Sequence, residues 1–176
     1  MHILKTFLST GKNGETPLHI AARHGFNETV LLLLSDGADF TLVNKVGENV
    51  LHIITKACHY GIATTLLQHI LKRQSKDGVT KLVNQKNKAG ESSVHYAASL
   101  KTTDVHYPFE DRDMMRLLLQ SGGDSMLEAP DTRETSVHYC SKSGNVNVFN
   151  EILAQLQPTD AQAACNKQAK VCLSNK

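Results

Sequence analysis

The chain has 176 residues, of which 40% are hydrophobic and 20% are charged, a balance that is typical of a globular protein and excludes a disordered one. A net charge of +2 gives no concentrated basic surface, so we expect no nucleic-acid partner; four cysteines without a CxxC pair predict neither a disulfide framework nor a zinc site. Residues 1–10 lack the pattern of a signal peptide and no apolar stretch approaches about 18 residues, which predicts a cytoplasmic chain that does not insert into a membrane.

A six-residue phrase recurs four times and is the most informative feature of the sequence. Its first copy is Gly14-Glu15-Thr16-Pro17-Leu18-His19, and every copy has glutamate second, an apolar residue fifth and histidine last. The histidines that end the four copies are His19, His52, His95 and His138. The first interval between them is 33 residues and the next two are 43 residues, which indicates one repeating unit with an insertion in two of its copies.

The phrases divide the chain into repeats. We predict one all-α domain over residues 1–176. It is a solenoid of about four helix-turn-helix repeats joined by finger hairpins. The expected repeats lie at about residues 12–44, 45–87, 88–130 and 131–165, with 166–176 as the truncated start of a further repeat or a tail.

The first two repeats show the plan of the unit. Thr16 and Pro17 predict a helix start, because threonine caps exposed amides and proline tolerates the first helical position. We expect a helix from there to His24-Gly25, a second from Thr29 to Leu34, and then an extended finger. In the second repeat the polar residues 72–81 are expected to form a surface loop or a lengthened second helix.

The last two repeats follow the same plan with one further insertion. Residues 102–111 stand between the helices of the third repeat, and Pro108 prevents them from being continuous helix. The acidic run Glu110–Asp113 is expected to be a solvated loop tip rather than a calcium site. With no further repeat beyond the fourth, we expect part of an apolar face to be exposed. That face comprises Val148, Phe149, Ile152, Leu153 and Leu156.

The four phrase-final histidines have two interpretations, a metal or catalytic one and a structural one. The structural one is favoured, because an imidazole at a helix start can accept from one group and donate to another, tying adjacent repeats together with the cap residue Thr16. Cys140 is expected to be a small buried hydrophobe, since it fills a place that alanine takes in other repeats. No phosphate loop, paired-carboxylate motif or triad pattern occurs, so we expect neither an enzyme nor a cofactor nor a metal.

The finger turns are the predicted partner-binding positions, because repeats in register project neighbouring side chains on one side. The residues assigned to these turns are Lys12, Asn13, Lys45, Val46, Lys88, Ala89, Thr132 and Arg133. The expected partner is another protein, of a cytoskeletal or signalling kind.

The run from Thr16 to Gly25 resembles a near-consensus ankyrin repeat. The irregular repeats resemble, more narrowly, the ankyrin array of TRPN (NOMPC-type) mechanosensory channels. The residues that carry this narrower resemblance are Gly47–His52, Cys58–Tyr60, Val105–Pro108, Gly122–Asp124 and Glu134–Asn145. The resemblance implies a protein-interaction and elastic tether module at the cytosolic face of the plasma membrane, without the pore. The alternative is a free-standing cytosolic ankyrin adaptor or inhibitor that regulates a signalling partner.

Overall fold

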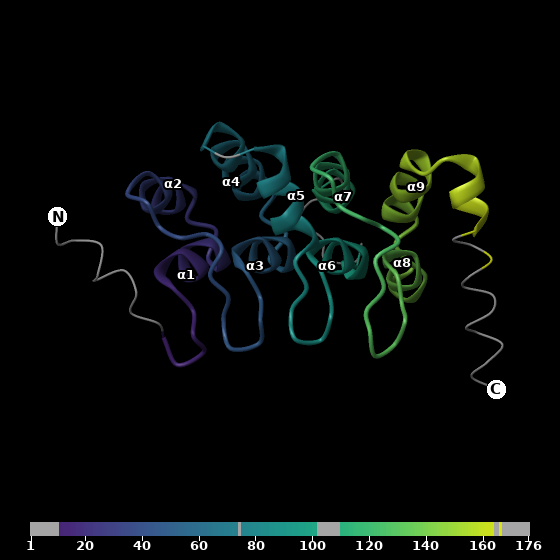
Figure 1. The fold of residues 1–176 in the computed structure, drawn as a ribbon, viewed down its shortest axis with the longest axis horizontal. Helices are drawn as coiled ribbons and strands as arrows, with labels where there is room; N and C mark the ends of the chain where they lie inside the picture. Colours follow the sequence, from purple (N-terminus) through teal and green to yellow (C-terminus); the bar gives the residue numbers. More distant parts are fainter. Residues whose placement is uncertain (1–10, 74, 102–109, 164–165, 167–176) are drawn as a thin grey trace.

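The computed structural model describes residues 11–73, 75–101, 110–163 and 166, and within them helix pairs follow one another in a row (Figure 1). The four pairs are α1 (Pro17–Arg23) with α2 (Asn27–Ser35), α3 (Val50–Lys56) with α4 (Tyr60–Arg73), α6 (Ser93–Ser99) with α7 (Glu110–Gln120), and α8 (Ser136–Ser143) with α9 (Val146–Gln155). A further helix, α5 (Lys76–Asn84), stands between the second and third pairs, and residues 158–163 are also helical.

The helices form two rows. The first helices of the pairs, α1, α3, α6 and α8, pack against one another in sequence order, and the second helices, α2, α4, α7 and α9, do the same (Figure 1). In the described ranges no strand forms, and the fingers contain only an isolated bridge between Val43 and Asn49. The all-α solenoid predicted from the sequence is therefore confirmed.

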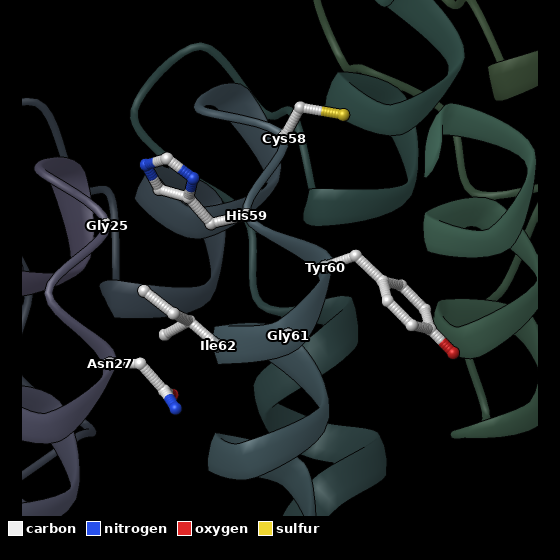
Figure 2. Close-up of a pocket in the computed structure, with 7 residues that line it drawn as sticks. All are labelled: Gly25, Asn27, Cys58, His59, Tyr60, Gly61 and Ile62. Carbon is white, nitrogen blue, oxygen red and sulfur yellow. The ribbon is translucent and has the colours of Figure 1, made fainter. Parts of the chain in front are cut away.

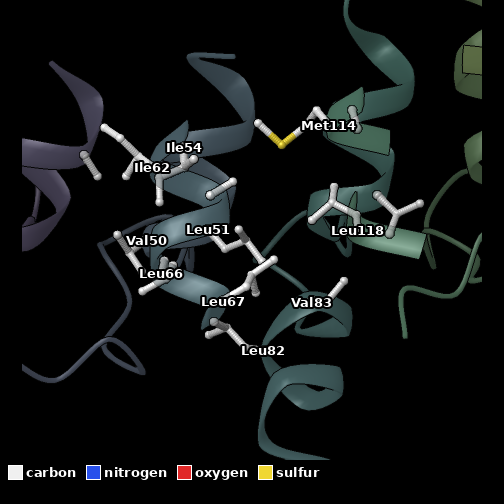
Figure 3. Close-up of a cluster of buried hydrophobic side chains, with 14 of the residues drawn as sticks. Val50, Leu51, Ile54, Ile62, Leu66, Leu67, Leu82, Val83, Met114 and Leu118 are labelled. Atoms are coloured by element: carbon white, nitrogen blue, oxygen red, sulfur yellow. The ribbon is translucent and has the colours of Figure 1, made fainter. Parts of the chain in front are cut away.

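Aliphatic side chains fill the space between the two rows. Figure 3 shows the part of this core where α3, α4, α5 and α7 meet, with Leu66 and Leu67 of α4 among side chains from the other helices. Burial of each such leucine contributes about 1.5–3 kcal/mol. Because α1, α3 and α6 are only seven residues long, too short to be stable alone in water, this packing is what holds them helical.

The insertion at residues 72–81 differs from both expectations, a surface loop or a longer second helix. Most of it belongs to α5, a separate helix that starts after Ser75, whose extended backbone (φ −71°, ψ 165°) ends the run of α4. Val79, Leu82 and Val83, spaced at i, i+3 and i+4, bury one face of α5 in the core. Two of these three residues lie beyond the insertion, which is why the polar segment alone gave no sign of a helix.

The turn after α7 holds α5 in place. The Asn84 side chain donates to the carbonyl of Gly122 at 2.8 Å and accepts from the amide of Asp124 at 2.8 Å. Gly122 has a φ of +90°, and a Cβ there would lie 2.5 Å from the Thr80 hydroxyl of α5. Only glycine therefore fits where α5 crosses this turn.

The acidic run Glu110–Asp113 is not a loop tip. It forms the first turn of α7, and acidic residues near the N-terminus of a helix stabilise it through the helix dipole. Met114, Met115 and Leu118 follow at helical spacing and are fully buried, so the core fixes this segment as helix. Pro108 and the rest of residues 102–109 lie outside the described residues.

The expected apolar face of the fourth repeat is largely covered. Val148 and Ile152 of α9 are fully buried, and Phe149 and Leu156 are packed partly against the core. Leu153 is half-buried, and Val146, at 65% exposure, is the large hydrophobic residue of this helix that is exposed. The neighbours α6, α7 and α8 supply the cover, because α9 turns its apolar side toward them. In the part of the chain that the structure describes, no helix combines the length and the apolar character needed to cross a bilayer.

Candidate protein-binding surface

The four fingers project on the same side of the helices (Figure 1). Each is closed by a backbone hydrogen bond to the carbonyl of the phrase glutamate: Gly11 to Glu15 at 3.0 Å, Asn44 to Glu48 at 2.9 Å, Asn87 to Glu91 at 2.8 Å and Ala129 to Glu134 at 2.9 Å. We call the surface made by the fingers and the adjoining helices α1, α3, α6 and α8 the finger face.

The first three fingers are joined to one another through the backbone. The Lys45 amide donates to the carbonyl of Asn13 at 2.9 Å, and the Lys88 amide donates to that of Val46 at 3.0 Å. This approach requires glycine at Gly47, where φ is +81° and a Cβ would lie 2.8 Å from the Lys88 nitrogen. These backbone hydrogen bonds therefore fix the positions of the first three fingers relative to one another.

The fourth finger departs from this register. It has one more residue between its closing pair, Ala129 and Glu134, than the other fingers have. Pro130, which has no amide hydrogen, lies against Gly90 where the second and third fingers place lysine. Arg133 adopts a left-handed φ of 55° in the place of the finger glycines. Arg133 therefore takes the place of Gly14, Gly47 and Gly90 in the turn, and the extra residue separates it from the position of Lys45.

All eight residues that the sequence assigned to partner binding are exposed. Lys12, Lys45 and Lys88 form no ion pair with any residue in the described ranges, whereas the Arg133 guanidinium lies 3.6 Å from the Glu128 carboxylate. The three lysines thus present uncompensated charge at the tips of three joined fingers. Whether they bind a partner stays a prediction.

The phrase-final histidines sit at the starts of the first helices. In each copy the backbone amide of the cap residue donates to Nδ1 of the histidine, as Asn49 does to His52 at 3.2 Å. With Nδ1 accepting, Nε2 carries the hydrogen, and that of His52 donates to the carbonyl of Glu91 in the next repeat at 3.2 Å. Nε2 of His19 and of His95 faces the equivalent glutamate carbonyls without meeting strict hydrogen-bond geometry.

Burial lowers the pKa of His19, His52 and His95 below the ordinary value. These rings are therefore neutral near pH 7, as a histidine that accepts at one nitrogen and donates at the other must be. Within the described residues no group of three or more metal-ligating side chains is positioned to hold a metal ion. The contribution of the histidines to stability stays a prediction.

A ladder of carboxylates and tyrosines on the finger face was missed by sequence reasoning. The Tyr96 hydroxyl donates to the Glu48 carboxylate at 2.9 Å, and the Tyr139 hydroxyl donates to that of Glu91 at 2.9 Å. Each tyrosine thus hydrogen-bonds to the carboxylate of the preceding repeat. The signal was present, because every phrase has glutamate second and the last two phrases are followed directly by tyrosine.

The ladder shifts the acidity of its members. Burial alone would raise the pKa of Glu48, but hydrogen bonds from Asn44 and Tyr96 and the charge of Lys56 hold it below its usual range. Burial and the hydrogen bond to glutamate raise the pKa of both Tyr96 and Tyr139. Glu48 is therefore ionised, and both tyrosine hydroxyls are protonated, at neutral pH.

The two cysteines near histidines do not form catalytic pairs. Cys58 and His59 line a surface cleft of about 350 Å³. In Figure 2 the His59 ring points toward Gly25, whereas the Cys58 side chain points away from that ring. Nε2 of His59 lies 3.2 Å from the carbonyl of Arg23, so the ring joins two repeats. Cys140 is buried as predicted, and burial raises its thiol pKa to about 12, which leaves no thiolate at neutral pH.

Helix pairs stacked in two rows, with fingers projecting on one side, define the chain as a solenoid of interaction repeats. The comparisons specify the repeat: residues 2–77 match the family model described as ankyrin repeats (3 copies). This match shows ankyrin repeats within residues 2–77, and the structure continues the same stacking of helix pairs as far as α9.

The chain is similar to short parts of much longer proteins. The chain is 28% identical over 120 residues to neurogenic locus notch homolog protein 1 of Mus musculus, and 27% identical over 120 residues to the protein of that name in Homo sapiens, 54% of this chain in both cases. It is 36% identical to Rabankyrin-5 of Homo sapiens over 58 residues, 33% of this chain. In each case the match spans 5% of the relative. These relatives give no support to the narrower resemblance to TRPN channels.

Proposed function

We propose that the chain is a protein-binding module whose partner lies along the finger face. Ankyrin repeats are protein-interaction units, so the fold supports the class of function. The observation that supports the finger face as the binding surface is the backbone hydrogen bonding from Lys45 to Asn13 and from Lys88 to Val46. It makes three finger tips one continuous, ordered surface.

An ordered surface favours binding because little conformational entropy is lost when the partner docks. Val46, at 55% exposure, and Ala89 offer apolar contact between charged tips. The three lysines, which form no ion pair in the described part of the chain, add electrostatic attraction, which acts mainly on association rate and specificity. The proposed role is binding, and no catalytic step is assigned to it.

The test places a photo-crosslinking amino acid at Val46 or Ala89 and compares it with the same probe at Leu32 of α2 or Leu71 of α4, which are exposed outside the finger face. The proposal expects one protein to be captured from the finger positions and not from the helix positions. Equal capture from both sets, or capture only from α2 and α4, would place the binding surface elsewhere.

Binding to the captured protein is then measured for a triple alanine variant of the finger lysines, Lys12, Lys45 and Lys88. A second triple variant, at Lys72, Lys76 and Lys81 on α4 and α5, removes the same charge from a different surface. We expect the first to weaken binding about tenfold and the second to leave it unchanged at constant ionic strength.

The finer role within this class is a segment of an elastic tethering array in the cytoplasm, beside a membrane channel. The support for it is the resemblance of the irregular repeats to TRPN arrays, and the named relatives do not add to it. A free-standing cytosolic adaptor is the rival. Sequencing of full-length transcripts separates them, since a tether requires coding sequence for more repeats and six membrane spans downstream, whereas an adaptor requires a stop codon.

A further inference from the structure

The four phrase glutamates differ in one respect. In three repeats the phrase glutamate pairs with a cation eight residues later: Glu15 with Arg23, Glu48 with Lys56 and Glu134 with Lys142. In the third repeat the residue eight positions after Glu91 is Ser99, which has no charge. Among the residues that the structure describes, no cation forms an ion pair with Glu91.

The second repeat shows the same arrangement with its cation present. There the Lys56 ammonium lies 3.5 Å from the Glu48 carboxylate and 5.6 Å from the centre of the Tyr96 ring, while the Tyr96 hydroxyl donates to that carboxylate at 2.9 Å. One cation therefore contacts both a negative charge and an aromatic face, two interactions that reinforce each other.

The third repeat reproduces this arrangement without the cation. Tyr139 donates to Glu91 at 2.9 Å, matching the Tyr96 contact, and the other carboxylate oxygen accepts from the Asn87 amide at 3.1 Å. Both donors are neutral, so the charge of Glu91 is held in position but not compensated. Glu91 and Tyr139 are half-buried and Ser99 is exposed, so the place that lysine takes in the second repeat is open to solvent.

We infer that Glu91 and Tyr139 together receive a lysine or arginine side chain of the bound protein, in the position that Lys56 takes beside Glu48 and Tyr96. A metal ion fits this place poorly, because Glu91 is a single carboxylate and its neighbours are a phenol and an amide. The inference rests on the proposed function, since it assigns a specificity position within the finger face. The inference predicts that the partner places a basic residue opposite the third repeat.

The experiment uses the peptide acetyl-Gly-Arg-Gly-amide as the probe and citrulline in place of arginine as its uncharged control. Amide chemical shifts of the isotopically labelled protein are followed during the titration at low salt. We expect shifts at Glu91, Ser99 and Tyr139 with the arginine peptide and none with the citrulline peptide. Glu91→Gln should abolish these shifts, while Glu134→Gln, whose carboxylate already has Lys142, should leave them intact.

The decisive variant is Ser99→Lys, which supplies from within the chain the cation that the partner would supply. Its lysine should occupy the site and weaken arginine-peptide binding about fivefold, the effect expected for losing one exposed charge-assisted contact. Unchanged binding in Ser99→Lys, or shifts spread equally over Glu15, Glu48 and Glu134, would overturn the inference. So would identical shifts with calcium chloride, which would make the site a metal site.

The two proposals fail in different ways. Photo-crosslinking at Val46 tests the finger face directly and does not depend on Glu91. If crosslinking succeeds and the arginine peptide does not perturb Glu91, the finger face stands and the cation site is wrong. If crosslinking fails at the finger positions while the peptide binds at Glu91, the proposal that the partner lies along the finger face is wrong.

Discussion

Replacement of His52 by alanine tests whether the phrase-final histidines hold adjacent repeats together. His52 is fully buried, its Nδ1 accepts from the Asn49 backbone amide at 3.2 Å, and its Nε2 donates to the Glu91 carbonyl at 3.2 Å. Removal of the ring leaves the Asn49 amide and the Glu91 carbonyl without their partner, at a cost of about 1–3 kcal/mol. The vacated space adds to this at about 24 cal/mol for each Å³ that does not collapse.

We therefore expect His52→Ala to lower the free energy of unfolding by about 3 kcal/mol, measured by urea denaturation at pH 7.5. This corresponds to a fall in melting temperature of about 6–12 °C for a chain of this size. The matched control is His24→Ala, because His24 is exposed at the end of α1 and its loss should cost less than about 0.5 kcal/mol. Equal stabilities of the two variants would refute a structural role for His52.

Three further outcomes are expected. Tyr96→Phe should cost about 1 kcal/mol by removing a hydrogen bond to a carboxylate, measured by urea denaturation, and Tyr60→Phe, at an exposed tyrosine of α4, should cost nothing measurable. Leu82→Ala should cost about 2–5 kcal/mol if α5 belongs to the core, and a loss below about 0.5 kcal/mol would show that α5 is peripheral. Stability should fall as the pH falls from about 6.5, because the folded-state pKa values of the buried histidines such as His19 and His95 are depressed, so the unfolded chain binds protons first. Urea midpoints from pH 8 to pH 5 that do not change would contradict the neutral state of these rings.

The helix starts and the first three finger turns were predictable because local chemistry fixes them. Thr16 and Pro17 act within one turn of helix, and the caps bond to residues only three positions away. Finger turns at Lys45 and Lys88 are marked in the sequence by Gly47 and Gly90, and the structure shows both glycines in the left-handed conformation. Such features depend on a few adjacent residues and need no knowledge of packing.

Features that depend on distant partners were not predictable in the same way. Whether residues 72–81 form loop or helix is decided by Val79, Leu82 and Val83 finding room beside α4 and α6. The shift of the fourth finger comes from one extra residue that precedes the repeated phrase, so the phrase gives no sign of it. The bond from Tyr139 to Glu91 joins residues 48 positions apart, and only the stacking of repeats brings them together.

If the finger face binds a partner as proposed, the differences between repeats, rather than their shared plan, set its specificity. The shared glutamate, cap and histidine build the same backbone four times, so they cannot distinguish one partner from another. The positions that vary lie one and four residues after the histidine, where the second repeat has Ile53 and Lys56 and the third has Tyr96 and Ser99.

These differences give the face a pattern of charge. Positive tips at Lys12, Lys45 and Lys88 run along the first three fingers, and an uncompensated carboxylate at Glu91 lies beside the last of them. A partner that satisfies both features places acidic groups over the tips and one basic group over Glu91. Because this arrangement is not symmetric along the solenoid, it fixes the direction in which the partner lies as well as its charge.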